Sequence, residues 1–393
     1  MSKTEAFTGQ SQKVKIIYVV TASFVVAWHL DNTLKRLPDN FEICVVGQDV
    51  SGYRQRYPNV TWVDIDLCRK ISVSSDIEAL FSLCRLFVRY KPDIVHSIMP
   101  KAGLLTALAG FLCRVPVRIH TFTGQVWATK RGVARFFLYN MDKLINTLNT
   151  VCLTDSPSQS QFLYEHGLAH RNQPMPVLAK GSLTGVDLSR FAANALVQPA
   201  NALRKELGLT TEHFVFAFIA RKTRDKGALD MIRAFSEVAA RHPECRLLFI
   251  GPDESKGELA ALQQSQPALF NQVILVDRVE NHPCYLAISQ VLCLPSYREG
   301  FGTIVIDAAA LGVPAIGSDI VGLRDAIEAD QTGVLFSMGN IAQFTAAMLS
   351  VFNHPDYLQR LGKAARQRVE VHFSADKLFQ ALVQFYSEQL QDH

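Results

Sequence analysis

The sequence lacks the cysteine patterns that mark disulfide frameworks and zinc sites. It has 393 residues and eight cysteines, and these form neither a Cys-x-x-Cys pair nor a metal-ligand spacing with histidine. Most of them lie inside apolar runs such as 42–47 (EICVVG) and 291–295 (VLCLP). We therefore expect buried, reduced thiols and a protein of a reducing compartment.

A long hydrophobic run is also missing. The longest apolar stretch, 102–113 (AGLLTALAGFLC), is too short to cross a bilayer and suits a buried helix. Residues 1–13 are polar, without the charged-then-apolar pattern of a signal peptide. These features predict a cytoplasmic protein, either soluble or peripheral on the cytoplasmic face of the inner membrane.

The sequence has no dense block of lysine and arginine, so nucleic acid is not an expected partner. The net charge of +4 is divided unevenly, with about +8 in residues 1–185 and about −4 in residues 186–393. The basic half suggests an anionic partner, either a phosphate-bearing molecule or a membrane leaflet. A scattered, solvated surface would explain the same charge count.

What the sequence does contain is enough apolar residues for a large core, at 48% hydrophobic and 19% charged. Short apolar strands alternate with amphipathic helices in both halves, which indicates parallel sheets covered on both faces. Strands are expected at 14–20, 42–47, 60–65, 93–97, 116–120, 151–154, 214–220, 246–251, 272–276, 291–294 and 314–317. Helices are expected at 24–37, 76–90, 103–112, 132–148 and 229–241, with a last helix capped by Ser374.

The periodicity breaks at 180–199, where Gly, Ser, Asp and Pro predict a domain linker. The predicted fold class is α/β, with two doubly wound, Rossmann-like parallel-sheet domains facing each other across a cleft. Their expected limits are 1–185 and 186–373, and residues 374–393 form a helix that packs back on the first domain. Ligands of such sheets bind at the carboxyl ends of the strands.

Two segments combine charge and glycine at predicted strand ends. In 219–227 (IARKTRDKG), Arg221 and Lys226 stand between a strand and a helix N-terminus, a suitable place for a diphosphate. A solvated basic turn would have the same composition. In 294–311 (LPSYREGFGTIVIDAAAL), Glu299 precedes glycines that let a ligand approach the backbone. Asp307 follows in the first turns of a helix, where the helix dipole alone would explain an acid.

Together these segments resemble the nucleotide-sugar site of family 4 glycosyltransferases, which are retaining enzymes of the GT-B fold. Segments 94–110 (IVHSIMPKAGLLTALAG), 181–191 (GSLTGVDLSRF) and 284–296 (CYLAISQVLCLPS) also read like family segments, in the expected order. The resemblance therefore covers nearly the whole chain.

The resemblance implies roles for individual residues. Arg221 and Lys226 match the basic pair that holds the donor diphosphate, and Glu299 matches the first acid of the family's E-x7-E motif; these three are the implied catalytic residues. The other implied donor-binding residues are Gly300, Phe301, Gly302 and Thr303 through their backbone, Asp307 at the ribose, and Val279 in the loop that meets the base.

The sequence departs from the family pattern at three places. The second acid is Asp307 instead of Glu, so the ribose contact is expected to be shifted or water-mediated. The loop 21–24 (TASF) lacks the glycines of many members, and Thr123 stands where many have histidine. His120 fits a structural histidine as well as a site residue. The residues expected on the acceptor or sugar side are Thr21, Ser23, His120, Thr123, Lys130 and Arg131.

The mechanism that the resemblance implies needs no protein nucleophile, because the leaving diphosphate accepts the acceptor's proton. It also implies no cofactor. Asp64-Ile65-Asp66 matches the D-x-D metal motif of the other large glycosyltransferase fold, but two aspartates alone are a poor metal site. We therefore expect that no metal is essential.

The implied reaction moves a sugar, an N-acetylhexosamine by resemblance, from a UDP-linked donor to a polyprenyl-diphosphate-linked saccharide in capsule or O-antigen synthesis. Lys130, Arg131 and Arg135 beside 136–138 (FFL) would form a basic and apolar membrane patch, whereas an ordinary helix would bury these rings. Two alternatives remain: an enzyme of the same fold that resembles UDP-N-acetylglucosamine 2-epimerase, and a non-catalytic nucleotide-sugar-binding partner of a transferase.

Overall fold

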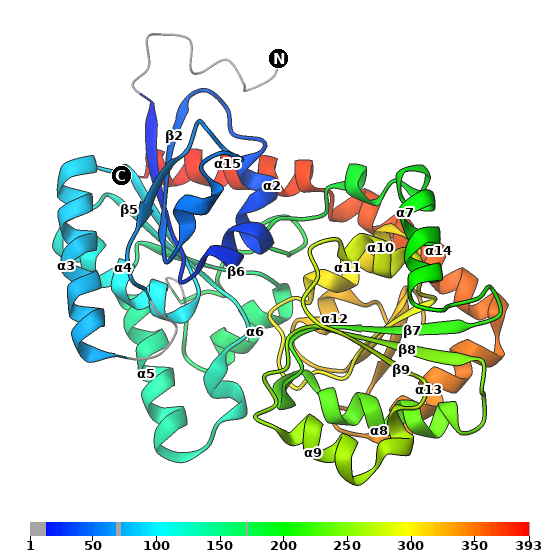
Figure 1. The fold of residues 1–393 in the computed structure, drawn as a ribbon. Helices are drawn as coiled ribbons and strands as arrows, with labels where there is room; N and C mark the ends of the chain where they lie inside the picture. The colour runs from blue at the N-terminus through cyan, green and yellow to red at the C-terminus, as the bar shows by residue number, and fades with distance from the viewer. Residues whose placement is uncertain (1–12, 68–71, 170–171, 393) are drawn as a thin grey trace.

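Two α/β domains make up the protein (Figure 1). The computed structural model describes residues 13–67, 72–169 and 172–392. Within these residues each domain contains a six-stranded sheet of parallel strands with helices on both faces. This arrangement confirms the predicted fold class.

The first sheet has the strand order β3-β2-β1-β4-β5-β6. In β1, one of the two middle strands, Ile17 and Val19 pack under the helices 73–90 and 100–112. Ile16 and Tyr18 of the same strand join the core on the opposite face. The strands are β1 (Val14–Val19), β2 (Phe41–Gly47), β3 (Thr61–Asp64), β4 (Ile94–Ile98), β5 (Val117–Phe122) and β6 (Val151–Thr154). The helices are α1 (Ser23–Val25), α2 (Asp31–Leu34), α3 (Val73–Tyr90), α4 (Pro100–Leu112), α5 (Gly132–Leu148) and α6 (Pro157–Glu165).

The second sheet has the order β12-β11-β10-β7-β8-β9. Phe235 of α8 and Phe344 of α13 are buried on one face of it, and α11 covers the other. The strands are β7 (Phe214–Ile219), β8 (Cys245–Ile250), β9 (Val273–Val276), β10 (Val291–Leu294), β11 (Ala315–Ser318) and β12 (Gly333–Phe336). The helices are α7 (Ala193–Glu206), α8 (Ala228–Ala239), α9 (Glu258–Ser265), α10 (His282–Ala287), α11 (Thr303–Ala310), α12 (Leu323–Ala326), α13 (Ile341–Asn353) and α14 (Pro355–His372), followed by α15 (Ala375–Gln391).

The chain crosses between the domains at two neighbouring points. Val186 donates its N–H to Phe373 O at 2.7 Å, and Ala375 donates its N–H to Val186 O at 2.8 Å. Gly185 has φ +62°, and a methyl group there would lie 2.7 Å from Phe373 O. The two crossings are therefore tied together by backbone hydrogen bonds.

The C-terminal helix α15 lies on the first domain, although the whole second domain precedes it in the sequence (Figure 1). The Tyr386 hydroxyl is 2.7 Å from the Tyr18 hydroxyl and 2.6 Å from His96 Nδ1. His96 Nε2 continues to Thr121 Oγ1 at 2.7 Å. Burial lowers the pKa of His96 to about 3, so the ring is neutral and has one donor and one acceptor for these two contacts.

The helix expected at 24–37 is shorter and interrupted. Between α1 and α2 the chain forms a π-helical turn, Val26–Leu30, and the helix ends at Leu34. This turn places Trp28 toward the second domain, where the Arg278 guanidinium lies 5.6 Å from the ring centroid. A contact between domains is not visible in local periodicity, and π turns often occur at functional sites.

The linker expected at 180–199 is also shorter, because α7 begins at Ala193. Pro199 lies inside this helix, where its ring removes one helical hydrogen bond. The helix buries only Ala200 and Leu203, so the sequence lacks the apolar stripe that would have indicated it. The four-residue edge strand β12 was not expected.

The cysteines that the structure describes are all free thiols, five of them buried and two, Cys84 and Cys113, half-buried. Of the helices within the described ranges, none has the length and hydropathy that crossing a membrane requires.

Replacing Tyr386 with Phe tests whether α15 stabilises the first domain through its hydroxyl. The change leaves His96 Nδ1 and the Tyr18 hydroxyl without this partner, at a cost of about 1–3 kcal/mol. We expect a melting temperature lower by roughly 2–10 °C in calorimetry. Tyr164, an exposed tyrosine of α6, provides the control, and Tyr164→Phe should leave the melting temperature unchanged. Equal melting temperatures for both variants would contradict the role of this network.

Candidate functional site

The carboxyl ends of β7 and β10 carry the two segments singled out in the sequence. After β7, residues Arg224–Lys226 form a 3-10 turn and α8 begins at Ala228. Gly227 between them has φ +68°, and a methyl group there would lie 2.0 Å from Pro295 O. Only glycine fits this approach, which holds the Lys226 turn against the segment that follows β10.

Lys226 and Glu299 meet at this point. Lys226 Nζ lies 2.6 Å from Glu299 Oε2, and Ser296 donates its hydroxyl to Glu299 Oε1 at 2.8 Å. Arg221 does not join them: its guanidinium pairs with Glu254 at 2.7 Å. The structure thus brings two of the three predicted catalytic residues into contact and places the third beside a separate carboxylate.

The loop 299–302, called the donor loop below, leads directly into α11. Gly302 has φ +83° and precedes Thr303, the first residue of the helix. The Phe301 ring is buried against Phe373, with ring centroids 5.3 Å apart, so this residue offers a ligand its backbone and not its ring. Free N–H groups at the start of α11 suit an anion or a polar sugar.

Asp307 lies one turn further along α11 and contacts a histidine that was not predicted. His282 Nε2, at the start of α10, is 3.1 Å from Asp307 Oδ2. Val279, the residue expected near the base, packs against an apolar cluster that includes residues of α7 and β8. Its neighbour Arg278 lies over the rings of Phe24 and Trp28 in the first domain, 5.8 and 5.6 Å from their centroids.

The first domain meets the donor loop through the segments that follow β5 and β6. Arg298 donates to Gly124 O at 2.6 Å, and the Ser156 hydroxyl donates to Gly300 O at 2.8 Å. A methyl group at Gly124 would lie 2.6 Å from the Glu299 carbonyl carbon. The carboxyl ends of both sheets therefore touch, and the donor loop is at the contact.

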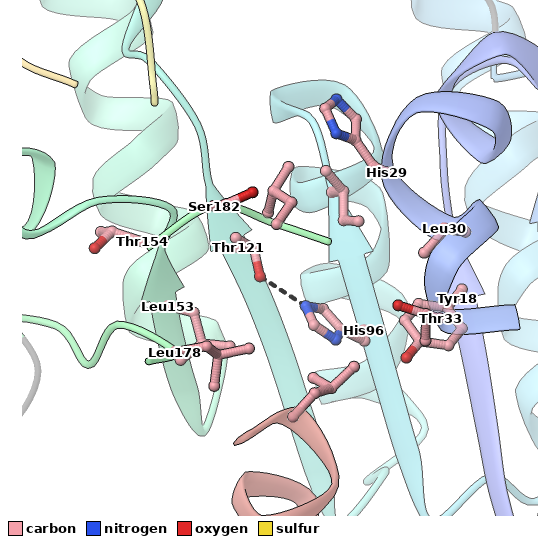
Figure 2. Close-up of a pocket in the computed structure, with 13 residues that line it drawn as sticks. Tyr18, His29, Leu30, Thr33, His96, Thr121, Leu153, Thr154, Leu178 and Ser182 are labelled. Carbon is pink, nitrogen blue, oxygen red and sulfur yellow. Dashed lines mark hydrogen bonds between the residues drawn. The ribbon is translucent and has the colours of Figure 1, made fainter. Parts of the chain in front are cut away.

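A pocket opens in the first domain close to this contact. It has about 20 Å³ of free space, room for roughly one water molecule, and lies between the sheet, the π-helical turn and α15. Figure 2 shows His29, His96, Thr121 and Ser182 around this space. The other lining residues are Tyr18, Leu30, Thr33, Ile98, Leu153, Thr154, Leu178, Leu183 and Leu382.

The pocket is neutral and partly polar. His29 Nδ1 is buried and has no hydrogen-bond partner among the described residues, and burial lowers the pKa of this ring to about 4. The remaining polar groups of the lining are hydroxyls and the neutral His96 ring. Such a lining suits a water molecule or a single hydroxyl group better than a phosphate.

The residues predicted on the acceptor side do not form one cluster. Thr21 is buried at the end of β1, Ser23 begins α1, and Thr123 adjoins Gly124 at the domain contact. Lys130 and Arg131 are exposed before α5.

His120 is buried in β5 between Ser97, whose hydroxyl lies 2.9 Å from Nδ1, and Gly103 of α4. Burial lowers the pKa of His120 to about 3. This environment favours a structural histidine, one of the two interpretations that the sequence left open for His120.

The D-x-D segment lies at the edge of the first sheet. Asp64 Oδ1 accepts the N–H of Ser51 at 3.0 Å. No group of three or more His, Cys, Asp or Glu side chains within 13–67, 72–169 and 172–392 is arranged to hold a metal ion.

Comparisons with known proteins agree with this geometry. Residues 25–177 match the family model "Glycosyl transferase 4-like domain", and residues 200–368 match "Glycosyl transferases group 1". The chain is 28% identical to the capsular polysaccharide biosynthesis glycosyltransferase CapM of Staphylococcus aureus, over 96% of this chain and 98% of that protein. It is 26% identical to the Escherichia coli UDP-Gal:alpha-D-GlcNAc-diphosphoundecaprenol alpha-1,3-galactosyltransferase, over 81% of each chain.

Solved structures show the same fold. The Anabaena protein HepE in complex with UDP superimposes with a TM-score of 0.77 at 15% identity, covering 95% of this chain and all of that one. A sucrose-phosphate synthase from Thermosynechococcus elongatus gives 0.79 at 18% identity, covering 97% of this chain and all of that one. With both domains matched by family models, the chain belongs to the family 4 glycosyltransferases of the GT-B fold.

Proposed function

We propose that the protein transfers a sugar from a UDP-linked donor, with retention of anomeric configuration, to a polyprenyl-diphosphate-linked saccharide during capsule or O-antigen synthesis. The observation that carries the proposal is the Lys226–Glu299 pair beside the N-terminus of α11, with an uncharged pocket on the facing domain. An N-acetylhexosamine is the donor sugar that we propose to test first.

The donor part of the proposal depends on charge. Lys226 and the N–H groups of residues 300–303 would hold the diphosphate, and Arg221 lies in the same loop after β7 as Lys226. Glu299 would face the donor sugar and Asp307, held by His282, the ribose. UDP is the nucleotide named for the E. coli relative and for the Anabaena complex.

The acceptor part depends on the neutral pocket. Thr154 and Ser182 line it, and their chain neighbours Asp155 and Gly181 pack on the donor loop. A saccharide lying in the cleft would place one hydroxyl at this pocket, close to the donor loop. The names of CapM and of the E. coli relative associate them with capsular polysaccharide and with a diphosphoundecaprenol acceptor.

The proposed chemistry is a single exchange at the anomeric carbon. The bond from this carbon to the diphosphate oxygen breaks, the bond to the acceptor oxygen forms on the same face, and the acceptor's proton passes to the leaving diphosphate. Lys226 and the start of α11 would stabilise the negative charge that develops on the diphosphate. We propose that no metal or other cofactor takes part, so a chelator should leave turnover unchanged.

Nucleotide binding is the first test. UDP at about 100 times its dissociation constant should stabilise the protein by about 2.7 kcal/mol, a shift of several degrees in a thermal melt. ADP, GDP and CMP should give smaller shifts, and Arg221→Ala/Lys226→Ala should abolish the UDP shift. A larger shift with another nucleotide would overturn the UDP assignment but not the site.

Turnover of Lys226→Ala tests the catalytic role. Removal of one electrostatic donor of this kind costs about 10²–10³ in kcat. We expect that loss in an assay with UDP-N-acetylglucosamine or UDP-N-acetylgalactosamine and a polyprenyl-diphosphate saccharide. The matched control is Lys363→Ala, which removes an exposed lysine of α14. Near-normal turnover of Lys226→Ala would contradict the assignment, and donor consumption without acceptor would indicate an epimerase reaction instead.

The start of α5 carries an exposed patch of Lys130, Arg131, Val133, Phe136 and Phe137, which we call the α5 patch. The exposed fractions of the three apolar residues are 83%, 71% and 50%. An ordinary amphipathic helix would have buried these rings, and cations beside exposed aromatic rings match an anionic lipid surface. We propose that this patch holds the enzyme at the membrane that carries its acceptor.

Vesicle sedimentation tests the α5 patch. Each basic residue near an anionic surface contributes about 1 kcal/mol, so Lys130→Gln/Arg131→Gln should weaken binding to phosphatidylglycerol-containing vesicles by roughly 30-fold. Phe136→Ser/Phe137→Ser should also release the protein. Met338→Ser, which removes an exposed apolar side chain of the second domain, should bind like the wild type. Equal binding of all variants would place the membrane contact elsewhere.

A further inference from the structure

Asp155 is a buried carboxyl group at the contact between the domains. It follows β6 directly, and the residue is only 4% exposed. Its backbone carbonyl accepts the N–H of Ser182 at 2.7 Å, but its Oδ1 has no hydrogen-bond partner among the described residues. A buried acceptor without a partner is costly and calls for a physical explanation.

The donor loop lies directly on this carboxyl group. A methyl group at Gly300 would be 2.1 Å from Asp155 Oδ2 and 2.7 Å from Gly124 N. Ser156, the next residue, holds Gly300 O at 2.8 Å. Asp155 is therefore covered by the second domain and loses its water because the two domains meet.

The charges that face Asp155 are carboxylates. Glu299 of the donor loop and Asp325 of α12 both raise its pKa, and Asp325 Oδ2 in addition accepts the N–H of Ser158 at 2.9 Å. The neighbouring cations have other partners or lie in solvent: Lys226 pairs with Glu299, and Arg298 with Gly124 O and Asp225. Lys180 in the adjacent loop is exposed. Burial first, and then these carboxylates, hold the pKa of Asp155 well above its usual range.

We propose that Asp155 is a positioning residue. Its protonated side chain holds the donor loop in place, so the two domains come together with the uptake of one proton. When the domains separate, water reaches the carboxyl group and it ionises with an ordinary pKa of about 3.9. The group thus binds a proton more tightly in the joined state. The joined state is favoured at low pH and is lost as the pH rises between the two pKa values, by about tenfold per pH unit.

Calorimetric titration with a UDP-sugar tests the proposal, and this readout uses the UDP donor of the proposed function. UDP-N-acetylglucosamine is a suitable probe, because both ends of its diphosphate are esterified and it does not titrate between pH 6 and 8. For the wild type, the dissociation constant should rise with pH in this range, approaching tenfold per pH unit where the ligand-free domains are mostly separate. Titrations at pH 8, in two buffers of different ionisation enthalpy, should show uptake of up to one proton.

Asp155→Asn carries a neutral side chain of the same shape, so its affinity should be independent of pH and its binding should take up no proton. Asp142→Asn is the matched control: Asp142 is also buried, burial raises its pKa to about 7, and it accepts Trp127 Nε1 away from the donor loop. This variant should keep the wild-type profile. A wild-type affinity independent of pH, or an unchanged profile in Asp155→Asn, would overturn the proposal.

Solution scattering of the ligand-free protein separates this proposal from the donor assignment. The radius of gyration of the wild type should be larger at pH 8 than at pH 6, whereas Asp155→Asn should have the smaller value at both. If no UDP-sugar binds at any pH, the donor assignment fails and the scattering alone decides the role of Asp155. Equal radii for the wild type at both pH values would overturn that role.

Discussion

The contact of the donor loop with Gly124, Asp155 and Ser156 determines the geometry of the cleft. Neither glycine of this contact has room for a side chain, because a methyl group at Gly124 or Gly300 would overlap atoms of the opposite domain. The Ser156 and Arg298 hydrogen bonds to backbone carbonyls fix the loop in this place. The consequence is that the Lys226–Glu299 pair and the start of α11 lie beside the segments that follow β5 and β6 of the first domain.

Both predicted phosphate-binding cations are paired with carboxylates, Lys226 with Glu299 and Arg221 with Glu254. The Arg221–Glu254 pair is partly exposed, and such pairs contribute little to stability. A diphosphate bound as proposed would replace this pair at low cost. Asp307 also has a partner in the ligand-free protein, because it contacts His282 from α10. Its side chain is one methylene shorter than the family's glutamate.

Most strands, and the position of the two glycine-containing segments after β7 and β10, could be predicted from the sequence, because they depend on local patterns. A buried parallel strand is a continuous apolar run, and the Gly227 and Gly302 turns follow from chain geometry that only glycine accepts readily. Three features could not be predicted in this way: the π-helical turn with His29, the contact of the donor loop with Asp155, and the His282–Asp307 contact. Each of them depends on packing between segments far apart in the chain, and the only local signal, the Ser156-Pro157 helix start, indicates a cap and not a domain contact.

The position of α15 has a consequence for synthesis on the ribosome. The first domain cannot complete its core when residues 13–185 emerge, because the sheet face that Tyr386 covers is filled by a helix from the end of the chain. The whole second domain must be translated before that helix is available. During this interval the nascent first domain exposes Ile16, Tyr18 and their apolar neighbours, the kind of surface that chaperones bind. The core of the first domain is therefore completed only after the second domain has been translated.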